Sequence, residues 1–266
     1  MITTAILSLI LGSVAQAPAA APAANGYASI VERVAPSIVT VNFVIRMDIS
    51  MMGQSQSEEI RSAVAGVAVA NDMVAVSLTA LDPAGSSPFA DQMDIKATPV
   101  SLRVVFGNSD KDLEAELAAK DPKLGLAFLK VKELGETKVQ PLTTEDAPSA
   151  GLGDEFIVVN RLSKNFDYAP HFQRGLITGT IEKPRRAYII QGGSTLGLPA
   201  FDSAGRLIGI LSSVDAGDDS DQGIGAMLLG DDFGPRAFIL PAKVFRKSIE
   251  RARAGETAPE ETEGDK

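Results

Sequence analysis

Two neighbouring hydroxyl side chains, Ser194 and Thr195, lie in a glycine-rich segment that is able to hold a reactive group in a tight turn. The segment reads GGSTLGLPAF over residues 192–201. A hydroxyl oxygen attacks a carbonyl carbon only when a nearby base accepts its proton. The chain has one histidine, His171, so the candidate bases are His171 and the lysines. Such a pair would support acyl transfer, although a turn serine more often bonds nearby backbone and a lone histidine is more often an ordinary loop or surface residue.

Other catalytic chemistries are restricted by the composition. The chain has no cysteine, which excludes disulfides, thiolate catalysis and zinc–thiolate sites, and its single histidine excludes multi-histidine metal sites. The stretch DAGDDSDQG (215–223) gathers four aspartates, but their spacing does not match an EF-hand calcium loop. We therefore expect a solvated acidic loop, no metal site and no cofactor.

The charge balance bears on the class of partner. The formal net charge is −9 and the pI is about 4.8, which disfavours nucleic acids and anionic membrane surfaces as partners. A modest basic cluster lies within residues 161–186. Against the acidic total, we interpret this cluster as ordinary surface and predict no nucleic-acid partner.

The N-terminal residues predict export. The apolar run Ala5–Ala15 is shorter than the roughly 20 residues of a membrane span and is followed by small residues, which is typical of a signal peptide. We expect a signal peptide over 1–17, with Ala15-Gln16-Ala17 as its cleavage site, and an Ala/Pro-rich linker over 18–26. The alternative is a loosely packed N-terminal arm. The mature chain is expected to be periplasmic or extracellular and to have no membrane span.

The elements that must position any site are mostly strands. Strict alternation in SIVTVNFVI (37–45) predicts a strand that buries Val39, Val41, Phe43 and Ile45. Five further strands are predicted in the same half of the chain: AGVAVA, MVAVSL, SLRVVFG, LEAELAA and GLAFLKV. A second set of six follows: EFIVVN, RGLITGTI, RAYIIQ, RLIGILS, GIGAMLL and AFILP. Short helices are expected at YASIVERVAP and AKVFRKSIERAR.

A Pro-, Gly- and acid-rich stretch at about 140–153 separates the two sets of strands. We therefore place a first β-barrel at 27–140, a second β-barrel at 141–241, a C-terminal helix at 242–254 and a disordered acidic tail at 255–266. The segment 46–62 lies between the first two predicted strands and is interpreted as an extra strand or a mobile loop.

Five phrases, in this order, resemble the bacterial HtrA/Do-type branch of the trypsin-like serine proteases. They are IVERVAPSIVTV, LEAELAAKDPKLGLAFLKV, RGLITGTI, GLPAFDSAGRLIGI and AFILPAKVFRKSIE. The resemblance covers residues 27–253. It implies an all-β fold, a trypsin-like double six-stranded β-barrel with short terminal helices. Members of that branch commonly carry a PDZ module after the protease domain, and no such module is evident before Lys266.

The resemblance also implies where a catalytic triad would stand. Its nucleophile motif, Gly-Asn-Ser-Gly-Gly-Pro, aligns with STLGLP and puts Leu196 at the nucleophile. The histidine falls on Thr79 or Ala80 of AVSLTALD, depending on one residue of register, and the aspartate falls on Gly125 of DPKLGLAFL. None of these side chains can do the work of a triad member. The framing residues remain at Asp121, Pro122, Leu126, Gly197, Pro199 and Gly205.

The sequence therefore predicts a catalytically inactive trypsin/HtrA-like protein that binds a polypeptide in the old substrate cleft, or that serves as a scaffold or regulatory subunit. Extended peptides would pair with a strand edge beside the cleft. The predicted cleft residues are Gln191, Gly192, Gly193, Ser194, Thr195, Leu196, Gly197 and Leu198. Two alternatives remain open. One is an active serine endopeptidase with Ser194 as a relocated nucleophile, and the other is a structural envelope protein whose cleft is plugged by Leu196 and Leu198.

Overall fold

The computed structural model describes residues 25–51, 54–83, 95–144, 149–183, 185–193, 195–213 and 237–256. The expected signal peptide (1–17) lies outside these residues. So do most of the expected linker (18–26) and all but the first two residues of the expected tail (255–266). Within the described residues, no helix is both long enough and apolar enough to cross a membrane.

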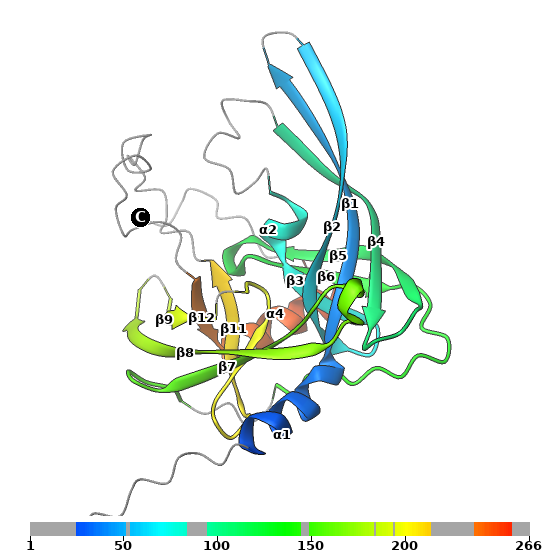
Figure 1. Ribbon diagram of the computed structural model, residues 1–266. Helices are drawn as coiled ribbons and strands as arrows, with labels where there is room; N and C mark the ends of the chain where they lie inside the picture. The colour runs from blue at the N-terminus through cyan, green and yellow to red at the C-terminus, as the bar shows by residue number, and fades with distance from the viewer. Residues whose placement is uncertain are drawn as a thin grey trace, which may run out of the picture.

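The first barrel is a closed antiparallel sheet whose strands follow the order β1-β2-β3-β6-β5-β4 (Figure 1). The strands are β1 (Ile38–Met51), β2 (Gln54–Ala70), β3 (Met73–Ser77), β4 (Ile95–Phe106), β5 (Asp112–Asp121) and β6 (Leu126–Val131). The alternation noted in the sequence is confirmed, since all four apolar residues that it assigned to the barrel interior are at most 6% exposed. Closure of the barrel therefore removes the apolar side chains on one face of each strand from water.

The second barrel is also closed, with strand order β10-β11-β12-β9-β8-β7. Its strands are β7 (Glu155–Arg161), β8 (Pro170–Ile181), β9 (Ala187–Gly192), β10 (Pro199–Phe201), β11 (Leu207–Ser213) and β12 (Ala237–Pro241). The sequence did not predict β10, because three residues that begin with proline carry no periodicity. The strand predicted at 223–229 lies outside the described residues. The predicted all-β double barrel is confirmed.

Short helices cover the barrels. Near the N-terminus, α1 (Asn25–Val34) buries Ile30 and Val34 in the core and is followed by a 3-10 turn, η1 (Ala35–Ser37), that contains Pro36. The C-terminal helix α4 (Ala242–Arg253) buries Phe245, Ser248, Ile249 and Ala252 on one face, as its apolar spacing predicted. The shorter elements are α2 (Leu78–Leu81), η2 (Pro122–Leu124) and η3 (Lys164–Phe166).

The two barrels share one hydrophobic core. Val67 and Phe128 of the first barrel belong to the same buried cluster as Phe156 and Ile210 of the second and Phe245 of α4. A continuous core of this kind fixes the two barrels relative to each other, because separating them would expose apolar surface to water.

Arg161, at the end of β7, makes one of the polar connections between the barrels. Its guanidinium donates hydrogen bonds to the carbonyl oxygens of Ile38 (2.7 Å), Ala35 (2.6 Å) and Tyr168 (3.0 Å). Burial lowers the pKa of Arg161 from its ordinary value. The three carbonyl oxygens replace the water that the guanidinium loses.

Strands β1 and β2 continue beyond the first barrel as a long hairpin, which rises above the rest of the molecule in Figure 1. Their pairing runs from Ile38↔Val67 to Met51↔Gln54 without a shift of register. The described part of the segment 46–62, which the sequence left as an extra strand or a mobile loop, is thus a continuation of two paired strands. Side chains over residues 56–63 of β2 are exposed.

Candidate functional site

The position predicted for the base lies in α2, a single helical turn that directly follows β3. Thr79 and Ala80 are both half-buried there. The backbone N–H of Leu78 donates to the carbonyl oxygen of Gly125 at 2.8 Å. This bond holds the predicted base position beside the position predicted for the aspartate, whichever of the two registers applies.

Gly125 ends the turn η2 in the left-handed conformation, with φ of 60°. A Cβ atom at this position would lie 3.2 Å from the Oγ atom of Ser212 in β11. Ser212 is itself buried, and its hydroxyl donates to the carbonyl oxygen of Leu124 at 2.5 Å. The turn therefore packs closely on the second barrel and leaves little room for a side chain at residue 125.

The same turn is held from the other side by a buried carboxylate, Asp121, which is 2% exposed. One oxygen accepts a hydrogen bond from the backbone N–H of Leu124 at 3.3 Å. The other accepts from Ser248 and from Arg251 of α4, each at 2.6 Å. Asp121 thus connects the turn to the C-terminal helix, which is a structural role.

The position predicted for the nucleophile, Leu196, is half-buried and precedes a glycine that touches the first barrel. A Cβ atom on Gly197, whose φ is 81°, would lie 2.5 Å from the backbone nitrogen of Ser77. The N–H of Gly197 donates to the carbonyl oxygen of Leu211, and the N–H of Leu211 donates to that of Leu198. Glycine is required at 197 because the loop lies directly against β3.

Thr79, Gly125 and Leu196 therefore lie on segments that contact one another at the junction of the barrels. The segments that carry them are joined by backbone contacts that do not involve the side chains of Thr79 or Leu196. None of the three side chains is a nucleophile with a general base beside it or a carboxylate to orient that base. These segments meet at the junction, and the residues at the three aligned positions are a threonine, a glycine and a leucine.

Ser194, the alternative nucleophile, lies outside the described residues. Among its neighbours in the predicted cleft, Gln191 and Gly192 are exposed at the end of β9. Gly192 and Gly193 both have positive φ, 86° and 54°, which keeps the chain here in a tight turn. Leu198 is fully buried within the core, so its side chain lies inside the barrel and not at the mouth of the cleft.

His171, the only histidine, lies in β8 opposite Asn160 of β7. The amide of Asn160 donates to the hydroxyl oxygen of Thr195 at 3.3 Å. Opposed residues of an antiparallel pair project from the same face of the sheet. The half-buried His171 therefore shares a face with a residue that contacts Thr195, although its ring makes no hydrogen bond within the described part of the chain.

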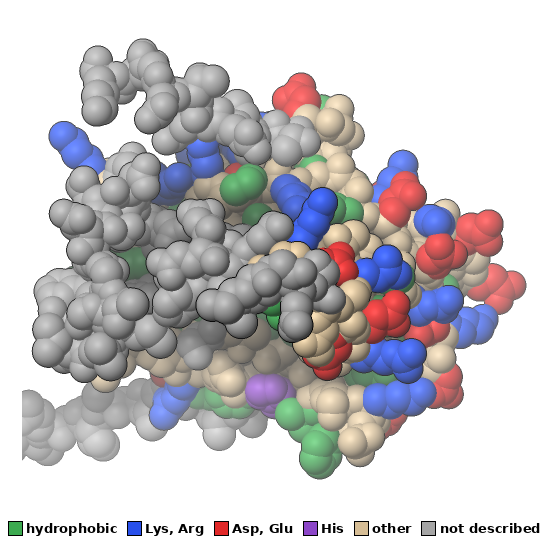
Figure 2. All heavy atoms as spheres, turned by 90° about the horizontal axis from the view of Figure 1, so that it is seen from above, with side chains coloured by type: hydrophobic (Ala, Val, Ile, Leu, Met, Phe, Trp, Pro, Cys, Tyr) green, Lys and Arg blue, Asp and Glu red, His purple; other side chains and the backbone are tan. Residues whose placement is uncertain are grey.

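The acidic stretch 215–223 lies outside the described residues, and so does any contact that it makes. Among the residues described, no group of three or more histidine or carboxylate side chains could hold a metal ion. Where Figure 2 shows described side chains, those of Lys and Arg are interspersed with those of Asp and Glu.

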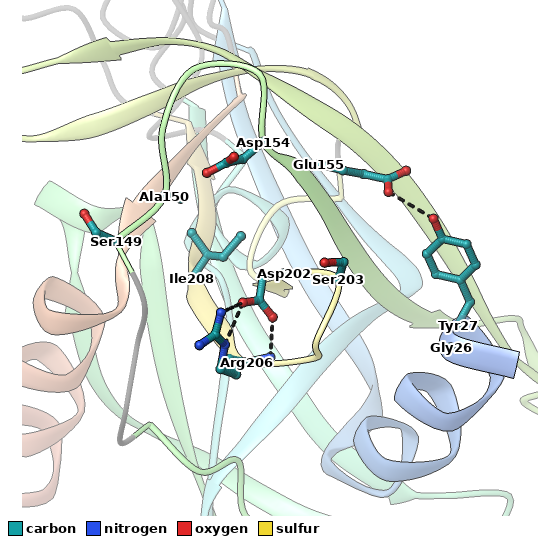
Figure 3. Close-up of a pocket in the computed structure, with 10 residues that line it drawn as sticks. All are labelled: Gly26, Tyr27, Ser149, Ala150, Asp154, Glu155, Asp202, Ser203, Arg206 and Ile208. Carbon is teal, nitrogen blue, oxygen red and sulfur yellow. Dashed lines mark hydrogen bonds and ion pairs between the residues drawn. The ribbon is translucent and has the colours of Figure 1, made fainter. Parts of the chain in front are cut away.

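A separate pocket lies between the N-terminus of α1 and the second barrel, and its lining residues are drawn in Figure 3. Its carboxylates already have partners. Tyr27 donates to Glu155 at 2.9 Å, Arg206 donates to Asp202 at 2.8 Å, and Asp154 accepts from the N–H of Gly151 at 2.8 Å. None of the predicted site residues lines this pocket. Its charged groups stabilise the local structure and do not form an unsatisfied ligand site.

The structural roles of two residues of the junction, Ser212 and Asp121, were not predicted from the sequence. Ser212 appeared only as the last letter of a predicted strand, and the dependence of Asp121 on α4 had no local signal. The retained Asp121-Pro122 pair was noted as a turn frame, which is the signal that could have identified the buried carboxylate.

Comparison with known proteins gives one family match. Residues 61–210 match the model of the trypsin-like peptidase domain, a range that contains Thr79, Gly125 and Leu196. No curated protein matches the chain significantly.

The solved structures that share the fold include the following three. Deg5 matches with a TM-score of 0.57 at 13% identity, over 88% of this chain and 97% of that one. A serine-to-alanine variant of the HtrA-type protease AlgW, with a decapeptide, gives 0.57 at 16% identity, over 86% and 67% of the two chains. An inactive serine-to-alanine mutant of Rv3671c from M. tuberculosis H37Rv gives 0.51 at 17% identity, over 89% and 97%.

Proposed function

The chain belongs to the trypsin-like peptidase family, and from that premise we propose that it is an exported member that has lost proteolysis and binds an extended polypeptide at the barrel junction. In this role it acts as a binding, scaffold or regulatory protein. Export is proposed from the composition of residues 1–17.

One observation carries the proposal. The junction keeps the backbone contacts that bring α2, the turn at Gly125 and the loop at Leu196 together, while no residue at the three aligned positions can perform triad chemistry. Loss of one member would leave a disabled enzyme with the other two groups in place. Loss of all three with the frame intact is what we expect when binding is the retained activity.

The end of β9 supports a backbone mode of binding. In the described residues, β12 pairs with β9 only at Tyr188 and Ile189. The next residues, Ile190 to Gly192, have no strand partner on that edge within the described residues, and Gln191 and Gly192 are exposed. An extended peptide can pair with such an edge through main-chain hydrogen bonds, which do not require a catalytic triad.

The contact between Asn160 and Thr195 favours one competing function. Because His171 lies opposite Asn160, its imidazole shares a face of the sheet with the residue that donates to the Thr195 hydroxyl. A relocated serine or threonine nucleophile would make the protein an endopeptidase.

A fluorophosphonate probe separates the two functions, because it labels only an activated hydroxyl. We expect no labelling of the purified chain and no cleavage of fluorescein-labelled casein, together with a rise in casein anisotropy on binding. The Ser194→Ala, Thr195→Ala and His171→Ala variants should bind casein as the parent does. Labelling and cleavage that disappear in any of these variants would establish a displaced catalytic site. Absence of casein binding by the folded chain would contradict the binding function.

A further inference from the structure

The outer edge of β2 is a long row of backbone groups without a strand partner. On one side, β2 pairs with β1 along residues 54–67. On the other side, the ladder with β3 begins only at Val67. Residues 54–66 therefore have no strand partner on that edge within the described chain. An edge of this length is a template for another strand.

The opposite edge of the same hairpin sheet is protected in ways that β2 is not. There, β4 is unpaired before Leu102, and it carries Lys96 and Pro99 on that stretch. Its pairing with β1 also shifts between Val44 and Ile45. Lysine, proline and bulges are the devices by which proteins prevent strands from adding to an edge. Residues 54–65 of β2, QSQSEEIRSAVA, contain no lysine, proline or glycine, and the pairing of β2 with β1 has no shift.

Ile60 is the middle residue of the exposed stretch 57–63 of this edge. Two identical antiparallel strands related by a two-fold axis must place one residue opposite its own copy. With Ile60 on the axis, the exposed residues Ser57 to Ala63 of one chain lie opposite the same residues of the other. The side chain of Ile60 is 44% exposed, so a large apolar group at the centre of this edge is left partly in water.

The charges favour the same register. With Ile60 on the axis, Glu59 of each chain lies opposite Arg61 of the other, which gives two opposite-charge pairs. Centring the pair on Glu58, Glu59 or Arg61 places that charged residue opposite its own copy. Directly opposed like charges destabilise a strand pair, and opposed unlike charges stabilise it.

The hairpin already contains half of this arrangement. Within one chain, Glu59 lies opposite Arg46 of β1, with their charged atoms 3.7 Å apart and both side chains about half exposed. Addition of a second β2 would place Glu59 between Arg46 and the Arg61 of the other copy. The extra arginine strengthens an interaction that the monomer leaves open to solvent.

We propose that the chain forms a homodimer in which the β2 edges pair antiparallel about a two-fold axis at Ile60. The two hairpins then form one continuous sheet with a barrel at each end. This inference uses the hairpin alone and does not depend on whether the barrel junction binds polypeptide or is catalytic.

The first test reverses charge across the interface and then restores it. The mass of the purified chain is measured by sedimentation equilibrium over a range of concentrations. Arg61→Glu places like charges opposite at two symmetric places, so the dimer dissociation constant should rise by about tenfold or more. The triple variant Arg46→Glu, Glu59→Arg and Arg61→Glu reverses every charge of the arrangement, which restores opposite charges within and between the chains, and should recover the dimer. Lys138→Glu, an exposed loop residue with the same change of charge, should leave the dimer unchanged.

The second test reads the register directly, because the natural chain contains no cysteine. In the Ile60→Cys variant the two thiols would face each other with Cβ atoms about 5 Å apart, close enough for a disulfide after small adjustment. Mild oxidation should give a covalent dimer. The Glu58→Cys variant places its two copies four residues apart along the strands, about 13 Å, and should remain uncrosslinked.

Three results would overturn the proposal. One is a parent chain that sediments as a monomer at every concentration. Another is a dimer that survives Arg61→Glu unchanged, which would require a different interface. The third is crosslinking of Glu58→Cys in place of Ile60→Cys, which would require a different register.

Discussion

At the scale of single residues, Gly125 shows how closely the turn η2 packs on the second barrel. A carboxylate there would begin at a Cβ atom 3.2 Å from the Ser212 hydroxyl, on a backbone with φ of 60°. Side chains other than glycine adopt this conformation at a cost of about 1–2 kcal/mol. The glycine therefore allows a tighter turn than a side chain would permit.

We predict that Gly125→Ala lowers the free energy of unfolding by more than Gly135→Ala does. Gly135 has a similar φ of 54°, but a Cβ atom there meets nothing within 4 Å. The left-handed strain is common to both sites, and the contact with Ser212 is present only at 125. Urea denaturation should show a difference of about 1 kcal/mol. Equal losses at the two sites would mean that the turn yields easily and that Ser212 does not limit it.

Single residues were also where sequence reasoning was weakest. Thr79, Gly125 and Leu196 could be proposed only by aligning short phrases with a known family, since nothing in a threonine, glycine or leucine indicates a lost function. The place of His171 opposite Asn160 depends on the pairing of β7 with β8, which no local pattern specifies.

At the scale of elements, α4 is bound to the first barrel by charge as well as by packing. Asp121 accepts hydrogen bonds from Ser248 and Arg251, while Phe245 of the same helix enters the shared core. The helix therefore holds the turn η2, which precedes Gly125, in place. Loss of either partner would leave a carboxylate buried without its hydrogen bonds.

We predict that Asp121→Asn lowers the free energy of unfolding by about 2–4 kcal/mol, because it removes the charge from a buried, hydrogen-bonded pair. Asp112→Asn is the matched control. Asp112 pairs with Arg103 at 3.1 Å with both side chains nearly half exposed, and its loss should cost less than about 1 kcal/mol. Chemical denaturation of both variants measures the difference. Similar small losses would show that the link to α4 carries little stability.

Elements were predicted well where one face is buried and poorly where none is. The alternation at Val39 to Ile45 predicted β1 because the barrel interior demands it. Beyond Ile45 the strand has no buried face of its own, so the sequence 46–62 could not reveal that β1 and β2 stay paired. The three-residue strand β10 was missed because it is too short to show a period.

At the scale of the whole molecule, the shared core makes the two barrels one folding unit. The cluster that contains Val67 and Phe128 also contains Phe156 and Ile210, so neither barrel can unfold without exposing apolar side chains of the other. Arg161 adds hydrogen bonds across the same boundary. The resemblance in sequence predicted two barrels, whereas the extent of their common core required the structure.

We predict a single unfolding transition for the whole chain. The three tyrosines, Tyr27, Tyr168 and Tyr188, belong to α1 and the second barrel, and the chain has no tryptophan. Tyrosine fluorescence therefore reports the second barrel alone, while far-ultraviolet circular dichroism reports both. The two denaturation curves should coincide. A fluorescence midpoint separated from the dichroism midpoint would show that the barrels unfold independently.

The bond between Asp121 and Arg251 joins residues 130 positions apart, and this separation constrains the order of events during biosynthesis. The turn η2 leaves the ribosome long before α4. The Asp121 carboxylate therefore gains its partners Ser248 and Arg251 only after nearly the whole chain has been made. Contacts of such high sequence separation form slowly. The bond between Asp121 and α4 therefore cannot form before the last part of the chain has been synthesised.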